Sequence, residues 1–196
     1  RAAAGESARY LWSGAPDAAR VLDYLRSVRR LTDDTIRAAG LGFNPTWKEL
    51  KYRESGDSDP IKLPPGITIP YEAGGAIWAI RVRAIVGNFA QHLDRPDQQF
   101  SGTTAPKYIN LTGSRAAGVL YGADRLAQFA GAVLFVEGEF DALLAGQEIG
   151  GMRVVTFGGA STAPSHIPHR WRAMLEASDR VYLALDSDQS GEAAAA

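Results

Sequence analysis

The chain has 196 residues, 45% of them hydrophobic and 22% charged, which is typical of one globular domain or two small ones and excludes a disordered or fibrous protein. No apolar run is long enough to cross a membrane, and the first residues lack the apolar core of a signal peptide, so we expect a cytoplasmic protein with no membrane partner. The absence of cysteine excludes disulfides and cysteine-ligated zinc within these residues, and the three histidines form no metal-binding pattern.

Charge is distributed unevenly along the chain. Residues 1–130 carry 17 Lys and Arg against 13 Asp and Glu, whereas residues 131–196 carry 4 against 9. A basic part followed by an acidic part fits an enzyme that handles a polyanion with a carboxylate metal site, although differences of this size also arise by chance. We therefore expect two domains, divided after residue 130.

Two helices are expected in the first part of the chain. Pro16 and Asp17 open the first helix, whose apolar residues fall on one face. These residues are Val21, Leu22, Leu25 and Val28. Thr32 caps a second, shorter helix that ends at Gly40.

Antiparallel strands are expected next. Residues 53–66 are rich in turn formers and predict an exposed loop, and residues 67–71 and 76–86 predict a hairpin. Because side chains alternate along a strand, Arg81 and Arg83 share one face of the second strand. The pair predicts a small basic patch, and the alternative is two ordinary solvated charges on an exposed face.

The segment after the hairpin predicts another loop, over residues 88–106, which leads into Lys107, Tyr108 and Asn110. A cation, an aromatic ring and an amide suit phosphate binding, base stacking and hydrogen bonding, which single-stranded nucleic acid requires. A helix is expected from Ala123 to Phe129.

The second part of the chain alternates strands and helices, which predicts a parallel α/β sheet. The expected elements are strands at 133–136, 153–157 and 180–185, with helices at 142–148 and 168–177.

Carboxylates follow the strands of this sheet. Glu137 follows the first strand, Asp141 begins the next helix, and Asp186 and Asp188 follow the third strand. Because the carboxyl ends of parallel strands share one edge, we expect a single cluster of oxygen ligands. Repulsion between these acids would be relieved by Mg²⁺ or Mn²⁺. The alternative at 137–141 is a surface turn that carries three acids.

An EF-hand calcium loop is an alternative for Asp-Ser-Asp-Gln-Ser-Gly at 186–191. Such a loop follows a helix and ends with glutamate at its twelfth position. Here a strand is expected before it, and the twelfth position would be residue 197. The metal-site hypothesis is therefore preferred.

The acidic segments resemble a known family. Val-Glu-Gly-Glu-Phe-Asp at 136–141 and the motif at 186–191 are similar to the two acidic motifs of a TOPRIM domain. Segments of the first part resemble, in order, the catalytic (RNA polymerase) domain of DnaG-type bacterial primases and their phage or plasmid relatives. These segments are Leu-Thr-Asp-Asp-Thr-Ile at 31–36, Leu-Gly-Phe at 41–43, Ile-Pro-Tyr at 69–71, Pro-Lys-Tyr-Ile-Asn at 106–110 and Leu-Tyr-Gly at 120–122.

The resemblance implies an α/β fold. An N-terminal α+β subdomain at 1–130, with two helices and then antiparallel strands, would be followed at 131–196 by a partial TOPRIM sheet. The zinc module that precedes this domain in primases is not present in these residues, and we expect a fragment truncated at its C-terminal end.

The resemblance also implies roles for residues. Glu137, Asp186 and Asp188 would be catalytic, and with Asp141 they would hold Mg²⁺ or Mn²⁺. The residues expected to bind nucleic acid or nucleotide are Arg81, Arg83, Lys107, Tyr108 and Asn110.

The implied activity is template-directed synthesis of short RNA primers from NTPs on single-stranded DNA, with a replicative helicase, fused or separate, as a further partner. Two alternatives stay open. One is DNA cleavage by a TOPRIM nuclease or topoisomerase, and the other is a non-catalytic module that docks nucleic acid or a helicase.

Overall fold

The structure is a computed structural model, and it comprises two compact units. The first unit contains Arg1–Pro70 and Ala79–Ser114, and the second contains Tyr71–Trp78 and Arg115–Ala196. The residues that the structure describes are 1–50, 61–112, 114, 118–126, 131–159 and 167–186. The expected loop tip at 53–60 and Asp188 lie outside them.

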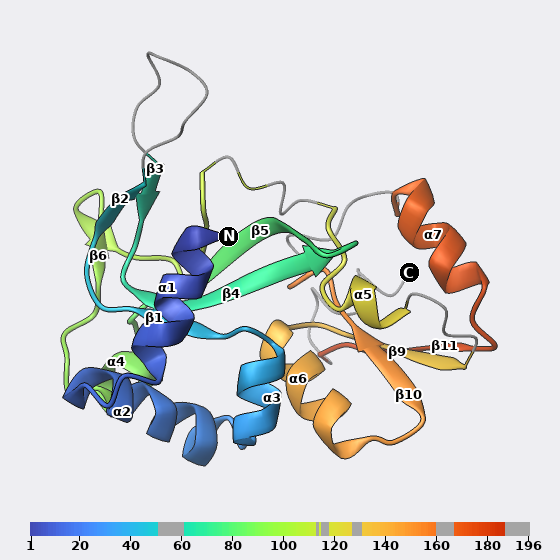
Figure 1. Ribbon diagram of the computed structural model, residues 1–196, viewed down its shortest axis with the longest axis horizontal. Helices are drawn as coiled ribbons and strands as arrows, with labels where there is room; N and C mark the ends of the chain where they lie inside the picture. The colour runs from blue at the N-terminus through green and yellow to red at the C-terminus, as the bar shows by residue number, and fades with distance from the viewer. Residues whose placement is uncertain (51–60, 113, 115–117, 127–130, 160–166, 187–196) are drawn as a thin grey trace. The chain divides into compact units, whose positions relative to one another are not determined.

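An antiparallel sheet in the order β1-β4-β5-β8 organises the first unit (Figure 1). Two short hairpins, β2–β3 and β6–β7, flank it. The strands of this sheet and of the two hairpins are β1 (Gly42–Asn44), β2 (Lys48–Leu50), β3 (Ile61–Leu63), β4 (Gly66–Ala73), β5 (Ala76–Arg83), β6 (Gln99–Phe100), β7 (Thr103–Thr104) and β8 (Tyr108–Asn110). The helices of the first unit are α1 (Ala2–Leu11), α2 (Pro16–Asp23), the π-helix η1 (Tyr24–Val28), α3 (Asp33–Ala38) and α4 (Asn88–His92).

The expected hairpin is confirmed as β4–β5. Its turn is Gly74-Gly75, where both φ angles are positive, 61° and 67°. Two glycines adopt such angles in succession without strain, and this turn matches the twist of paired strands. The last residues of β4 and the first of β5 belong to the second unit.

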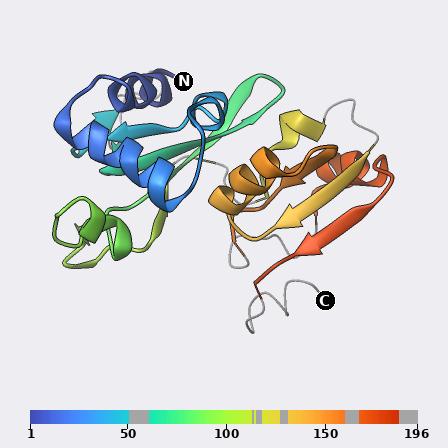
Figure 2. The same cartoon turned by 90° about the horizontal axis from the view of Figure 1, so that it is seen from below.

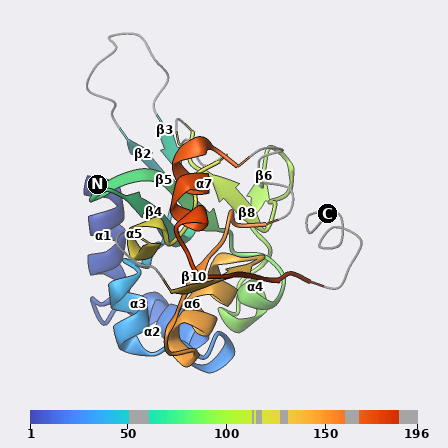
Figure 3. The same cartoon turned by 90° about the vertical axis from the view of Figure 1, so that its right-hand side faces the viewer.

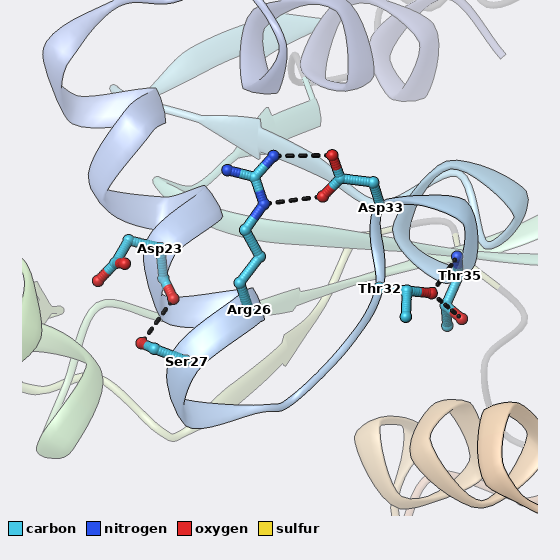
Figure 4. A network of polar contacts seen from close by, with 6 residues as sticks. All are labelled: Asp23, Arg26, Ser27, Thr32, Asp33 and Thr35. Carbon is cyan, nitrogen blue, oxygen red and sulfur yellow. Dashed lines mark hydrogen bonds and ion pairs between the residues drawn. The ribbon is translucent and has the colours of Figure 1, made fainter.

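The two expected helices are also confirmed, with one change in the first. Thr32 caps α3 by accepting a hydrogen bond from the Thr35 amide at 3.2 Å (Figure 4). The first helix becomes a π-helix at Tyr24, where the Arg29 amide donates to the Tyr24 carbonyl five residues back. The longer turn shifts the phase of the helix, so Val28 is 50% exposed and not inward as predicted.

An ion pair connects η1 to α3. The Arg26 guanidinium donates to both Asp33 oxygens, at 2.7 and 2.8 Å, and lowers the pKa of that carboxyl (Figure 4). The pair is about half exposed, so its contribution to stability is small.

Two helices of the first unit were not predicted. α1 packs on β1, and a Cβ placed on Gly42 would lie 2.5 Å from backbone atoms of Ser7 and Ala8. α4 lies inside the expected loop at 88–106 and buries Phe89 against Tyr24, with ring centroids 4.6 Å apart.

The second unit contains the expected parallel sheet, in the order β10-β9-β11. Its elements are α5 (Ala123–Leu126), β9 (Ala132–Val136), α6 (Glu139–Glu148), β10 (Met152–Val155), α7 (His169–Glu176) and β11 (Val181–Ala184). The chain runs from the central strand β9 through α6 to β10 on one side, and then through α7 to β11 on the other side. Because both connections are right-handed, α6 and α7 lie on opposite faces of the sheet. Figures 1 and 3 show this arrangement, and Figure 2 shows β9 and β11 side by side.

The parallel sheet brings three strand ends to one edge. Val136 pairs with Ala184 of β11, so Glu137 leaves the sheet beside the residues that lead to Asp186.

The unit boundary differs from the expected division after residue 130, because the sequence from Arg115 onward groups with the sheet. Among the described residues, no helix is long and apolar enough to span a membrane.

Candidate functional site

Strand β8 brings all five residues expected to bind nucleic acid together. It pairs antiparallel with β5, so that Arg83 lies opposite Tyr108 and Arg81 lies opposite Asn110. The Ala84 amide extends the pairing to the Lys107 carbonyl at 3.0 Å. Residues separated by more than 20 positions are therefore neighbours in the first unit.

The two arginines are buried, with 7% of Arg81 and 3% of Arg83 exposed. The alternative that they are solvated charges on an exposed face is therefore wrong. The Arg83 guanidinium donates to the carbonyls of Ala84 at 2.6 Å and Val86 at 3.2 Å. Burial lowers the pKa of Arg83, but arginine keeps its charge because its ordinary pKa is far above neutrality.

The ring of Tyr108 lies among three cations. Arg81 Cζ is 4.6 Å from the ring centroid, Arg83 Cζ is 5.7 Å away, and Lys107 Nζ is 5.8 Å away. Cation–π attraction fixes side chains of like charge around one half-buried ring. The positive charge at this end of β8 is therefore held in place by the protein.

A pocket of about 430 Å³, which we call the cationic pocket, opens at the Lys107 end of β8. Its lining contains three cations and no acid. The lining residues are Tyr24, Val28, Arg29, Arg83, Val86, Gly87, Asn88 and Lys107. Arg29 Nε donates to the Tyr24 hydroxyl at 3.0 Å. Such a lining suits an anion that carries several charges, such as a phosphate group.

A second hollow of about 920 Å³, which we call the stacking groove, lies at the Asn110 end of β8. The rings of Trp47 and Phe100 stack in its wall, with centroids 5.8 Å apart and planes 26° apart. Both rings are exposed, at 46% and 40%. Lys48, Lys62 and Asn110 also line the groove.

Sequence reasoning missed Trp47, Phe100 and Arg29. Trp47 and Phe100 lie more than 50 positions apart in the chain, so no local spacing connects them. The available signal was an aromatic residue inside a polar, turn-rich segment, which is unusual unless the ring packs or binds something. Arg29 enters the pocket lining just after the π-helix, which periodicity does not predict.

The carboxylates lie in the second unit. Glu137 Oε2 accepts a hydrogen bond from the Asp186 amide at 3.2 Å, so these two strand ends meet as expected. Asp141 folds back over the turn, and a Cβ placed on Gly138 would lie 2.7 Å from Asp141 Oδ2. Glycine at 138 thus leaves room for the Asp141 carboxylate.

These oxygen donors are of the kind that Mg²⁺ and Mn²⁺ prefer. Within the described residues, however, no three acidic or histidine side chains lie close enough to hold an ion. Asp188, the fourth expected ligand, lies outside those residues. The structure therefore brings the Glu137 carboxylate to the Asp186 backbone and the Asp141 carboxylate to Gly138, and a metal site stays a prediction.

No model of a protein family matches the chain, and no curated protein matches it either. Several solved structures are similar in fold. A DNA primase domain from Pseudomonas aeruginosa has a TM-score of 0.69 at 22% identity, over 99% of this chain and 62% of that one. The RNA polymerase domain of Mycobacterium tuberculosis primase DnaG has a TM-score of 0.67 at 20% identity, over 99% and 67%.

A DnaG primase catalytic domain bound to ssDNA is similar too, with a TM-score of 0.66 at 19% identity, over 97% of this chain and 64% of that one. The chain thus spans less than two thirds of the Pseudomonas and ssDNA-bound chains. Identities this low speak to the fold alone. Over the part it shares with these structures, the chain has the fold of the DnaG primase catalytic core.

Proposed function

We propose that the chain is part of a DNA primase, which synthesises short RNA primers on single-stranded DNA. The observation that carries the proposal is the pairing of β8 with β5, because it joins a pocket suited to phosphate to a groove suited to bases. The resemblance of the acidic segments to TOPRIM motifs and the DnaG catalytic-core fold support the same function.

Each end of β8 has its own role in this proposal. Lys107 binds phosphate groups of an NTP or of the growing primer, with Arg29 beside it, and the buried Arg83 adds positive charge to the wall of the cationic pocket. Trp47 and Phe100 stack on template bases, and Asn110 hydrogen-bonds to a base edge. Tyr108 holds the buried Arg81 and Arg83 in place through its ring.

The carboxylates of the second unit supply the chemistry. Glu137 and Asp186, with Asp141 and Asp188, would provide oxygen ligands for Mg²⁺ or Mn²⁺, and Glu137 would accept the proton of the attacking 3′-hydroxyl. A bound divalent cation would polarise that hydroxyl and neutralise charge on the triphosphate. Attack at the α-phosphorus then expels pyrophosphate. A helicase partner stays a prediction from the resemblance.

Removing the groove's tryptophan tests the template site. Trp47→Ala is expected to weaken binding of a single-stranded oligo(dT) about tenfold, because stacking contributes ~1–3 kcal/mol per base. Trp47→Phe keeps a ring and should bind nearly as well as the wild type. Fluorescence anisotropy with a labelled oligonucleotide measures both.

Tyr182→Ala is the matched control for this experiment, because Tyr182 is 45% exposed, as Trp47 is 46% exposed, but lies on β11. It should leave oligo(dT) binding unchanged. Equal losses in Trp47→Ala and Tyr182→Ala, or none in either, would mean that the groove does not bind template.

The charge of Lys107 is tested by the salt dependence of oligo(dT) binding. Lys107→Ala is expected to reduce the slope of log K against log salt by about 0.7, since one phosphate contact on single-stranded DNA is lost. Lys107→Arg should keep the wild-type slope. A salt titration of oligo(dT) binding distinguishes the two variants, and an unchanged slope in Lys107→Ala would remove Lys107 from the binding surface.

A further inference from the structure

Glu139 is the middle acid of the segment Glu137–Asp141, and the proposed reaction does not use it. Its side chain is fully buried, although it lies between an exposed aspartate and a half-buried glutamate. The Tyr71 hydroxyl, which is also fully buried, donates to Glu139 Oε1 at 2.5 Å. Both groups of this hydrogen bond are therefore shielded from solvent.

The Tyr71–Glu139 pair belongs to a network around one turn, at Glu137 and Gly138. The Tyr71 ring packs on Tyr121, with centroids 5.0 Å apart. Tyr121 in turn exchanges backbone hydrogen bonds with Thr156 at the end of β10, at 2.8 and 3.3 Å. The Thr156 hydroxyl then donates to the Glu137 carbonyl at 2.6 Å and accepts from the Gly158 amide at 2.8 Å.

The turn is thus held on both sides of Gly138. Thr156 fixes the backbone of Glu137, and Tyr71 fixes the first residue of α6. Between these anchors, the Glu137 carboxylate accepts from the Asp186 amide at the end of β11. Its direction therefore depends on a turn whose two ends are bonded to other elements of the second unit.

We infer that Glu139 and Tyr71 are positioning residues, whose buried hydrogen bond aims the Glu137 carboxylate at the carboxyl edge of the sheet. If the phenol is removed, a buried carboxyl loses a hydrogen-bond donor and turns toward water, and the first turn of α6 moves with it. The catalytic importance of this direction rests on the proposed function, whereas the geometry itself does not.

Amide hydrogen exchange in the 196-residue chain, measured by NMR without metal, tests the geometry. In Tyr71→Phe the Asp186 amide should exchange at least fivefold faster than in the wild type, as it should in Glu137→Ala, which removes the acceptor. Glu139→Gln should stay within twofold of the wild type, because its amide oxygen still accepts from Tyr71.

The Val133 amide is the reference, since it donates to the Arg180 carbonyl at 2.8 Å within the same sheet. It should keep its wild-type exchange rate in every variant. If Asp186 exchange in Tyr71→Phe stays within twofold, or if Val133 accelerates equally, the pair serves only general stability and the inference is overturned.

Primer synthesis by the full-length protein tests the consequence. Tyr71→Phe should lower kcat about tenfold and leave the KM for NTPs within twofold, with Glu139→Gln close to the wild type. Unchanged kcat in Tyr71→Phe, together with faster exchange at Asp186, would show that the direction of Glu137 does not matter for the reaction. A wild-type protein that makes no primers would contradict the proposed function, and the exchange rates would still decide the geometry.

Discussion

Glu137→Gln is expected to reduce primer synthesis by about two orders of magnitude or more, because a positioned acid–base group contributes roughly 10²–10⁴ to rate. The substitution keeps the size of the side chain and an oxygen that can accept from the Asp186 amide, so the fold should be unchanged. The assay is incorporation of labelled NTP by the full-length protein, with thermal unfolding measured in parallel.

Glu148→Gln is the control for this variant, since Glu148 is an exposed acid at the other end of α6. It should keep full activity. A Glu137→Gln protein with wild-type activity would remove Glu137 from the chemistry, and an equal loss in Glu148→Gln would show that the assay responds to surface charge alone.

Gly66→Ala is expected to destabilise the chain by about 3 kcal/mol or more, through backbone strain and overpacking together. Gly66 has a φ of 143°, which only glycine adopts readily. A Cβ there would overlap the Arg83 carbonyl oxygen and lie 2.8 Å from Val82 Cγ1. Urea unfolding followed by circular dichroism measures the loss.

Gly150→Ala is the matched control, because the φ of Gly150 lies outside the left-handed region and a Cβ placed there would meet no atom within 4 Å. It should change the free energy of unfolding by less than about 0.5 kcal/mol. Because Gly66 packs against the Arg83 backbone, oligo(dT) binding should also fall in Gly66→Ala. Wild-type stability in this variant would mean that β4 and β5 are not packed as described.

The order of strands and helices in the second unit was predictable. Apolar runs that end at an acid or glycine, such as 133–136, are typical of buried strands, and alternation with helices predicts parallel pairing. The meeting of Glu137 with Asp186 followed from that topology. Asp188, the other predicted ligand after this strand, lies outside the described residues.

The arrangement of the first unit was less predictable, since it depends on pairing between distant segments. The register of β8 on β5 places Lys107 beside Arg83, and nothing local to either segment encodes that contact. Alternation correctly placed Arg81 and Arg83 on one face, but burial on both faces of β5 depends on tertiary packing. The stacking of Trp47 on Phe100 likewise depends on tertiary packing and could not be predicted from either segment alone.

The most direct measurement of the central claim uses the full-length protein with a 5′-labelled single-stranded DNA template, NTPs and Mg²⁺ or Mn²⁺. We predict new short RNAs that are complementary to the template, with the template itself intact. Cleavage of the template without incorporation of NTPs would contradict the primase assignment and favour a nuclease or topoisomerase.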